Sequence, residues 1–243
     1  MNLRSLFLVL LWSTPLLAQS YVSRIIPDYT NLKKPPIRAV KVERTDSAIQ
    51  FSFHSVRFRI TQYGDLVQPL ITARKNAAVA ERELISASPF FPDAECRIVS
   101  FDADGNGVDD LFIVFPYGLT GMNSNVDVIA AFLFFPDSSW KFVNLRSYYG
   151  DTDLFRDYTR DGHYEYACIN EVQSSTATYD VVNIFSIKDG VFTNTTRNVA
   201  GFPAFAEETD SGPVIIKELP PSVTGDWYLK KPDVLTSGKE AMN

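Results

Sequence analysis

The sequence has few of the residues that most often carry catalysis or cross-links. In 243 residues it contains two histidines, His54 and His163, and two cysteines, Cys96 and Cys168. Neither histidine has a nucleophile or a metal-binding partner at a recognisable spacing, so Ser-His-Asp and Cys-His catalysis are poorly supported. We therefore expect that the protein is not an enzyme.

Basic residues and long apolar runs are also scarce. The chain has 23 Lys and Arg against 29 Asp and Glu, a net charge of −6. Proteins that bind nucleic acid usually present a basic excess instead. After residue 20, no apolar run is long enough to cross a bilayer. We expect neither a nucleic-acid partner nor a membrane span.

Residues 1–20 have the pattern of a secretory signal peptide. Arg4 supplies a positive start, and Leu6 to Leu17 form an apolar core that is too short for a membrane span. The mature protein should therefore be secreted or periplasmic. Such compartments permit a disulfide between Cys96 and Cys168. The alternative is two buried free thiols.

An acidic loop followed by a strand is the main feature that the sequence does contain. Positions 1, 3, 5, 6, 7 and 9 of this loop are Asp102, Asp104, Asn106, Gly107, Val108 and Asp110. Alternating oxygen side chains, a glycine at the bend and a backbone carbonyl at position 7 are typical of Ca²⁺ loops. An EF-hand would have Glu at position 12, but Ile113 stands there, within an apolar run typical of a buried strand. The sequence predicts a calcium site closed by Asp110.

The same loop pattern recurs 55 residues later. The equivalent positions are Asp157, Thr159, Asp161, Gly162, His163 and Glu165. His163 offers its carbonyl at position 7. Thr159 replaces a carboxylate, so we expect this second loop to be the weaker Ca²⁺ site. The apolar runs that start at Val126 and Val181 keep the same spacing. A fixed period of this length indicates a repeat architecture, with the clearest copies at 95–147 and 148–200.

These loops resemble FG-GAP/VCBS repeats, the calcium-loop blades of integrin α-chain propellers. The resemblance covers roughly 95–196, and the first loop matches the pattern D-x-[DN]-x-[DN]-G-x-x-[DE] throughout. It implies an all-β fold of β-propeller-like repeats with inter-strand calcium loops. The alternative is a β-sandwich that carries two such motifs.

The sequence predicts one repeat domain over 21–219, which includes the two copies, and an extended, partly disordered tail over 220–243. Residues 209–216 look like a further unit that has lost its ligands. Apolar alternation predicts strands at 49–53 and 56–60, with a turn or a bulge at His54 and Ser55 where the phase changes. Residues 73–85, rich in Ala, Glu and Arg, favour a surface helix.

The function that these patterns favour is an exported, calcium-stabilised binding or interaction module with a protein or glycan ligand. The alternative is a periplasmic inhibitor or immunity-type protein directed against a cell-wall hydrolase.

Overall fold

The computed structural model describes residues 21–26, 28–63, 68–76, 78–83, 96–117, 126–148, 151–223, 227–230 and 232. These residues form an all-β protein of three antiparallel sheets, with a helical turn at 21–25. The expected all-β class is confirmed. The expected signal peptide at 1–20 and the tail end at 233–243 lie outside the described residues.

Each sheet is built mainly from one stretch of the chain. The N-terminal sheet contains Glu43–Arg44 (β2), Ala48–Phe53 (β3), Val56–Tyr63 (β4), Gln68–Lys75 (β5) and Ala78–Glu83 (β6). The middle sheet contains Arg38–Ala39 (β1), Arg97–Phe101 (β7), Asp110–Tyr117 (β8), Val126–Phe134 (β9) and Trp140–Tyr148 (β10). The C-terminal sheet contains Phe155–Arg156 (β11), Glu165–Gln173 (β12), Thr178–Lys188 (β13), Val191–Asn194 (β14), Ala204–Glu207 (β15) and Val214–Ile216 (β16). Short 3-10 turns lie at Tyr29–Asn31 (η1), Thr152–Leu154 (η2) and Thr196–Asn198 (η3).

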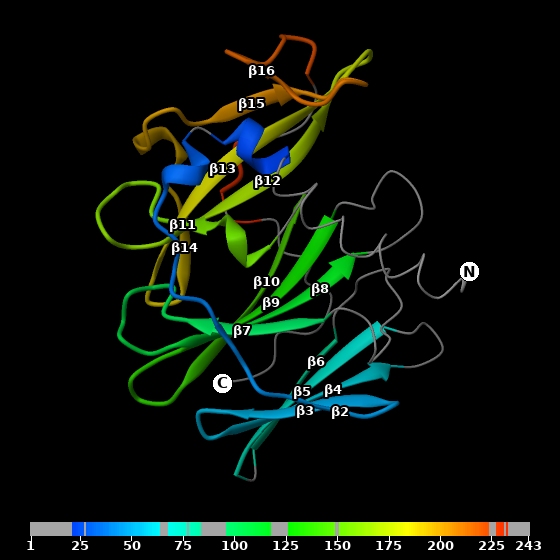
Figure 1. The fold of residues 1–243 in the computed structure, drawn as a ribbon, viewed down its shortest axis with the longest axis vertical. Coiled ribbons are helices and arrows are strands. Elements are labelled where there is room, and N and C mark those ends of the chain that lie inside the picture. The colour runs from blue at the N-terminus through cyan, green and yellow to red at the C-terminus, as the bar shows by residue number, and fades with distance from the viewer. Residues whose placement is uncertain are drawn as a thin grey trace, which may run out of the picture.

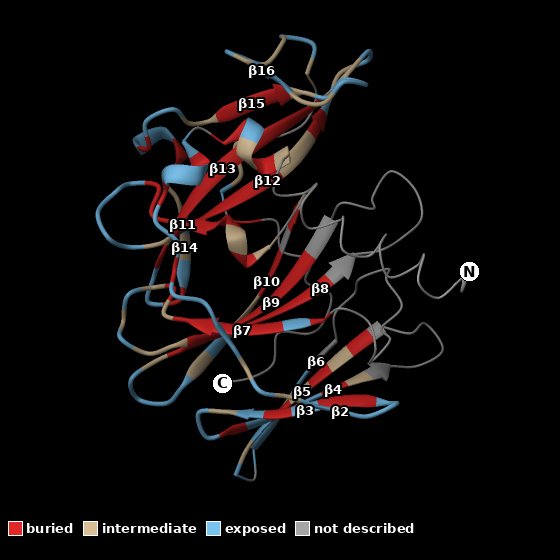
Figure 2. Ribbon diagram, in the orientation of Figure 1, coloured by how far each residue is buried: buried red, intermediate tan, exposed pale blue. Residues whose placement is uncertain are grey.

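The three sheets are stacked, with the middle sheet packed on both faces (Figure 1). Successive side chains of a strand point to opposite faces. Along β8, Phe112 and Val114 therefore join the core shared with the C-terminal sheet, while Leu111, Ile113 and Phe115 join the core shared with the N-terminal sheet. This explains why the run after the first loop is continuously apolar rather than alternating. In Figure 2 the described residues of β7 to β9, in the middle sheet, are mostly buried.

The two outer faces of the stack are covered differently. On the C-terminal sheet, Tyr179, Val181 and Phe205 pack against apolar residues of the chain end, including Trp227. The carbonyl of Trp227 accepts a 2.8 Å hydrogen bond from Asn183 Nδ2, so this part of the expected tail is fastened to β13. The outer face of the N-terminal sheet is polar and exposed, with Gln50, Ser52 and Arg57 along β3 and β4.

Of the turn or bulge expected at His54 and Ser55, the turn is confirmed, because it joins β3 to β4. The expected helix over 73–85 is wrong. Residues 68–75 and 78–83 form the β5–β6 hairpin instead, with Ala73 paired to Ala80. Helix propensity amounts to only tenths of a kcal/mol per residue, and ladder hydrogen bonds with burial of Ile71 and Ala73 outweigh it.

The further unit expected at 209–216 is also wrong. β16 pairs with β15, which pairs with β13, so this segment completes the edge of the C-terminal sheet. The described residues thus form three layers, rather than the two of a β-sandwich, and the sheets do not close into a ring.

The two cysteines are buried and not joined by a disulfide, and they occupy different cores. Cys96 packs between the middle and N-terminal sheets, whereas Cys168 packs between the middle and C-terminal sheets. The middle sheet separates them, so the disulfide that an exported protein permits is not formed.

None of the helical segments in the described part of the chain is long and apolar enough to cross a membrane.

Candidate metal centre

The first acidic loop connects β7 to β8 at one end of these two strands of the middle sheet. Phe101 and Asp110 are paired across the two strands, so the loop leaves and re-enters the ladder at neighbouring positions. Gly105 and Gly107 have φ values of 74° and 84°, in the left-handed region that glycine adopts without strain. These two glycines allow eight residues to fold back within so short a span.

The loop brings three carboxylates together. Asp102, Asp104 and Asp110 each present a carboxylate oxygen, and these oxygens all lie within 4.8 Å of one another. Asp110 is fully buried. One oxygen of Asp104, Oδ2, is buried and has no hydrogen-bond donor in the described residues. Three negative groups at this separation repel one another unless a cation or protons balance them.

Backbone N–H groups hold the remaining oxygens in place. Asp102 accepts from Gly105 and Asn106 through Oδ1 and from Gly107 through Oδ2. Asp110 accepts from Ala103 at 3.0 Å and from Phe134, the last residue of β9, at 2.7 Å. A carboxylate oxygen has two lone pairs. Asp102 Oδ2 and both Asp110 oxygens thus keep one lone pair each for a further partner.

Asn106 and Val108 complete the loop. Asn106 donates from Nδ2 to the carbonyl of Phe134 at 2.8 Å, and its Oδ1 accepts from the Val108 N–H at 2.8 Å. The Val108 side chain packs against the core shared with the N-terminal sheet. Through Asn106 and Asp110 together, both polar groups of the Phe134 backbone are bonded to the loop.

The electrostatics reflect this crowding. Burial raises the pKa of Asp110 from 3.8 to about 8; the neighbouring Asp104 and Asp102 raise it further, while the Ala103 and Phe134 N–H groups oppose the shift. Burial also raises the pKa of Asp104. A divalent cation in the group would favour the charged carboxylates and reverse both shifts.

The second loop, between β11 and β12, repeats the backbone of the first. Arg160 and Gly162 have φ values of 59° and 95°, at the positions equivalent to Gly105 and Gly107. Asp157 Oδ2 accepts from Gly162 at 3.1 Å, and Asp161 Oδ1 accepts from His163 at 2.9 Å. Glu165 accepts from Tyr158 at 2.8 Å, as Asp110 does from Ala103. The equivalence that the sequence predicts is therefore present in three hydrogen bonds and two backbone conformations.

The two loops differ at position 3. The Thr159 hydroxyl donates to Glu165 Oε1 at 2.9 Å, so the closing carboxylate is satisfied inside the loop. Asp157, Asp161 and Glu165 do not form a close carboxylate group, and Asp102, Asp104 and Asp110 form the one such group found in the described residues. Asp157 Oδ1 is nevertheless buried without a hydrogen-bond donor.

Contacts from both neighbouring sheets reach the first loop, and sequence reasoning missed them. His54 Nε2, in the β3–β4 turn, lies 2.9 Å from the Asp109 carbonyl. The His163 ring lies so close to Gly105 that a Cβ there would meet its Nδ1 at 2.8 Å. These residues are about 50 positions or more from the loop in sequence, and no spacing rule connects them. Neither histidine belongs to the carboxylate group.

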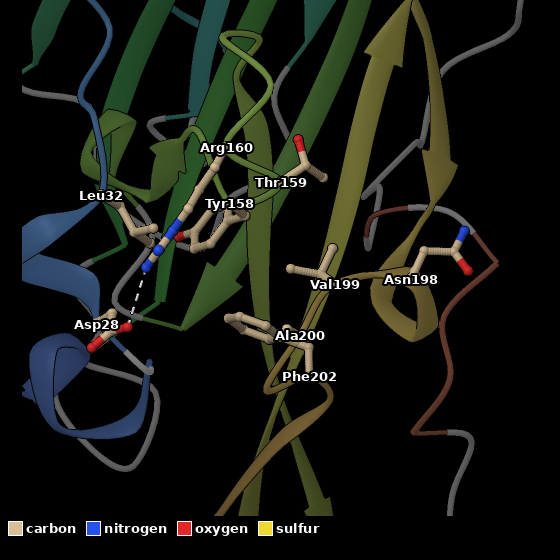
Figure 3. Close-up of a pocket in the computed structure, with 9 residues that line it drawn as sticks. All are labelled: Asp28, Leu32, Tyr158, Thr159, Arg160, Asn198, Val199, Ala200 and Phe202. Atoms are coloured by element: carbon tan, nitrogen blue, oxygen red, sulfur yellow. Dashed lines mark hydrogen bonds and ion pairs between the residues drawn. The ribbon is translucent and has the colours of Figure 1, made fainter.

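A cavity of about 470 Å³ lies beside the second loop. Figure 3 shows Tyr158 and Leu32 on one side of it and Val199, Ala200 and Phe202 on the other. Arg160 and Asp28 form a 3.2 Å ion pair at its rim. The volume and the mixture of apolar walls with a polar rim suit a small ligand or one residue of a larger one.

The fold and this loop define the class of the protein: a stack of three antiparallel sheets with an acidic, oxygen-rich candidate ion loop at one end of two middle-sheet strands. Comparison with family models, curated proteins and solved structures gives no match for this chain.

Proposed function

We propose that the protein is an exported β-repeat binding module whose fold is stabilised by a Ca²⁺ ion in the first loop. The ion would be held by Asp102, Asp104, Asn106, the Val108 carbonyl and Asp110. The observation that carries this proposal is the group of three carboxylates within 4.8 Å that includes the buried Asp110. The buried, unpaired Oδ2 of Asp104 supports it, because a desolvated anionic oxygen without a partner is costly.

The choice of calcium rests on the donor set. The proposed ligands are oxygens alone, from carboxylates, an amide and a carbonyl, without a histidine or cysteine ligand. Hard cations prefer such ligands, and Ca²⁺ tolerates irregular geometry better than Mg²⁺. The resemblance of both loops to FG-GAP/VCBS repeats points to the same ion.

The role of the ion would be structural. Asp110 and Asn106 already connect the loop to the end of β9, and His54 and His163 contact it from the two neighbouring sheets. An ion that binds only the folded loop stabilises the folded chain by mass action. We propose that the three sheets are propeller-like repeats of the FG-GAP/VCBS type and that their loop edge recognises a protein or glycan. The cavity beside the second loop supports such a role, because loops and cavities on a rigid scaffold commonly bind ligands.

Calcium titration and thermal unfolding test the proposal. The wild type should bind Ca²⁺ in calorimetry and unfold at a higher temperature in Ca²⁺ than in chelator. The gain should approach about 2.7 kcal/mol when the free ion is a hundredfold above its dissociation constant. Mg²⁺ is the control ion. The Asp104→Asn variant should lose most of the Ca²⁺-dependent rise in unfolding temperature. An unchanged midpoint in chelator together with no calcium uptake would overturn the proposal.

The export proposal rests on residues 1–20 and is tested separately. The intact mass of protein taken from its native compartment should lack residues 1–18 or 1–20. A mass that includes Met1 to Leu17 contradicts it.

A further inference from the structure

The outer face of the N-terminal sheet carries an unusual set of charges. One face of this sheet packs on the middle sheet through residues such as Phe51, Phe58 and Ile60. The register of β2 to β6 places the alternate residues together on the opposite face. The exposed ones are Glu43, Gln50, Ser52, Arg57, Arg59, Arg74, Val79 and Glu81, while Thr61, Leu70 and Thr72 on this face are half-buried and Ala48 is buried.

Three arginines dominate the centre of this surface. Arg57 on β4 is directly opposite Arg74 on β5, and Arg59 follows Arg57 on the same face. We call Arg57, Arg59 and Arg74 the arginine face. None of the three makes an ion pair or side-chain hydrogen bond with the residues that the structure describes.

This arrangement does not help the fold. Like charges directly opposite each other on a sheet face are destabilising. The protein is acidic overall, with 29 Asp and Glu residues against 23 Lys and Arg, yet no acidic side chain stands opposite Arg57 or Arg74. Local conflicts of this kind are expected at functional sites, where binding rather than stability decides the residue.

The chemistry of the surface favours a hydrated anionic polymer over a protein. A protein interface usually has aromatic or apolar anchors at its centre, and among the described side chains of this face the large apolar residues are Val79 on β6, 40 % exposed, and the half-buried Leu70 on β5. Guanidinium groups instead bind carboxylates and phosphates through paired hydrogen bonds. Cross-strand and along-strand neighbours on a sheet lie roughly 5 and 7 Å apart. Repeating anionic groups of similar separation can therefore contact all three arginines.

The surrounding residues distinguish carboxylates from phosphates. Gln50, Ser52 and Thr72 supply neutral amide and hydroxyl groups between the arginines, and these can bond to sugar hydroxyls. Glu43 and Glu81 stand at the margins, where they would repel a densely charged phosphate chain more than a polymer with one charge per sugar. We propose that the arginine face binds an anionic polysaccharide whose sugars carry carboxylates. This ligand deepens the binding role proposed above and rests on that proposed function.

Oligomers of glucuronic acid are the probe. The mature protein should bind them, and affinity should fall as salt rises, since the contacts are ionic. Arg57→Gln, Arg59→Gln and Arg74→Gln should each weaken binding about tenfold, the low end of the effect of losing one charge-assisted bond, because these side chains are exposed. Lys217→Gln removes an equal charge from an exposed site beyond β16 on the C-terminal sheet and should leave affinity unchanged.

The unfolding midpoint of the arginine variants is a second measurement. Arginines with a purely structural role would lower the midpoint when replaced, not raise it. Because Arg57 and Arg74 oppose each other, Arg57→Gln or Arg74→Gln should raise the unfolding midpoint by about 1 to 3 °C while it weakens binding. Equal affinity of wild type and all three arginine variants would overturn the proposal. So would tighter binding to polyphosphate, equal binding to neutral glucan oligomers, or no binding to oligoglucuronate.

The design separates this proposal from the calcium proposal. Binding is measured in chelator, below the midpoint of the ion-free protein, so that calcium cannot bridge sugar carboxylates. Asp104→Asn should bind oligoglucuronate like the wild type, since Asp104 lies in the β7–β8 loop of the middle sheet and not on the arginine face. A calcium response without oligoglucuronate binding contradicts only the arginine-face proposal. Binding without a calcium response contradicts only the calcium proposal.

Discussion

The two acidic loops have the same backbone but different internal chemistry. Both place left-handed residues at positions 4 and 6, and in both the carboxylate at position 1 accepts from the glycine N–H. In the first loop, Asp104 leaves a buried oxygen unpaired and Asp110 reaches the end of β9. In the second, Thr159 donates to Glu165, so that the closing carboxylate is satisfied within the loop. The residue at position 3 therefore separates a loop with three close carboxylates from one in which a hydroxyl satisfies the closing carboxylate, although Asp157 Oδ1 of the second loop is also buried without a donor.

The closing carboxylates should show this difference most strongly. Asp110→Ala leaves the buried Ala103 and Phe134 N–H groups without acceptors and should cost about 3 to 4 kcal/mol even in chelator. Glu165→Ala is the matched change and should cost about 2 kcal/mol, because its donors lie in the loop itself, where the backbone can relax. Urea unfolding measures both. A larger loss for Glu165→Ala contradicts the ranking.

A buried carboxylate outside the loops shows how burial changes the pKa of such a group and, through it, the free energy of unfolding. Asp180, on β13, is fully buried and accepts a hydrogen bond from the Tyr21 hydroxyl. Burial raises its pKa from 3.8 to about 7, Glu208 and Glu171 add to the shift, and the Tyr21 hydrogen bond opposes it. Folded Asp180 thus keeps a proton that the unfolded chain releases near pH 4.

Stability should therefore fall as pH rises from about 4 to 7, by on the order of 4 kcal/mol from Asp180, and in chelator the raised pKa of Asp110, about 8, should extend the fall to about pH 8. Asp180→Asn should remove the part of this fall that belongs to Asp180 and keep the part that belongs to Asp110, measured as unfolding free energy against pH in chelator. Glu218→Gln, at an exposed site, is the control and should keep the wild-type slope. An equal slope in Asp180→Asn contradicts the assignment.

Exchanging position 3 between the loops should exchange their behaviour. Asp104→Thr should remove the calcium-dependent gain, about 2.7 kcal/mol at a hundredfold excess of free ion over its dissociation constant. Thr159→Asp should add a second bound Ca²⁺ in calorimetry, because it frees Glu165 and supplies a fourth carboxylate beside Asp157, Asp161 and Glu165. If Thr159→Asp binds no additional ion, position 3 does not account for the difference between the loops.

Position 4 should give the smallest effect. Gly105→Ala forces a side chain into the left-handed region, 2.8 Å from His163 Nδ1, and should cost about 1 to 2 kcal/mol. Arg160→Gly, at the equivalent position, relieves the same backbone strain and should stabilise by a few tenths of a kcal/mol to about 1 kcal/mol. Its exposed ion pair with Asp28 contributes little against this gain. Thermal unfolding of both variants decides the sign.

The sequence by itself determined the features that depend on local chemistry. The loop glycines, the turn at His54 and Ser55, and the strand after Asp110 follow from backbone preferences and apolar patterns over a few residues. The repeat spacing likewise indicated that the two loops are equivalent, and their hydrogen bonds agree. The β5–β6 hairpin shows the limit of such patterns. Its Ala- and Glu-rich segment forms strands because backbone hydrogen bonds to the neighbouring strands outweigh its helix propensity.

Only the tertiary structure decided which distant segments meet. The stacking order placed Cys96 and Cys168 in separate cores, brought His54 and His163 to the first loop, and made β16 an edge of the C-terminal sheet. It also placed Arg57 opposite Arg74 on an exposed face. These contacts depend on strand register and on how sheets pack, and both are set by burial summed over the whole chain rather than by any short stretch.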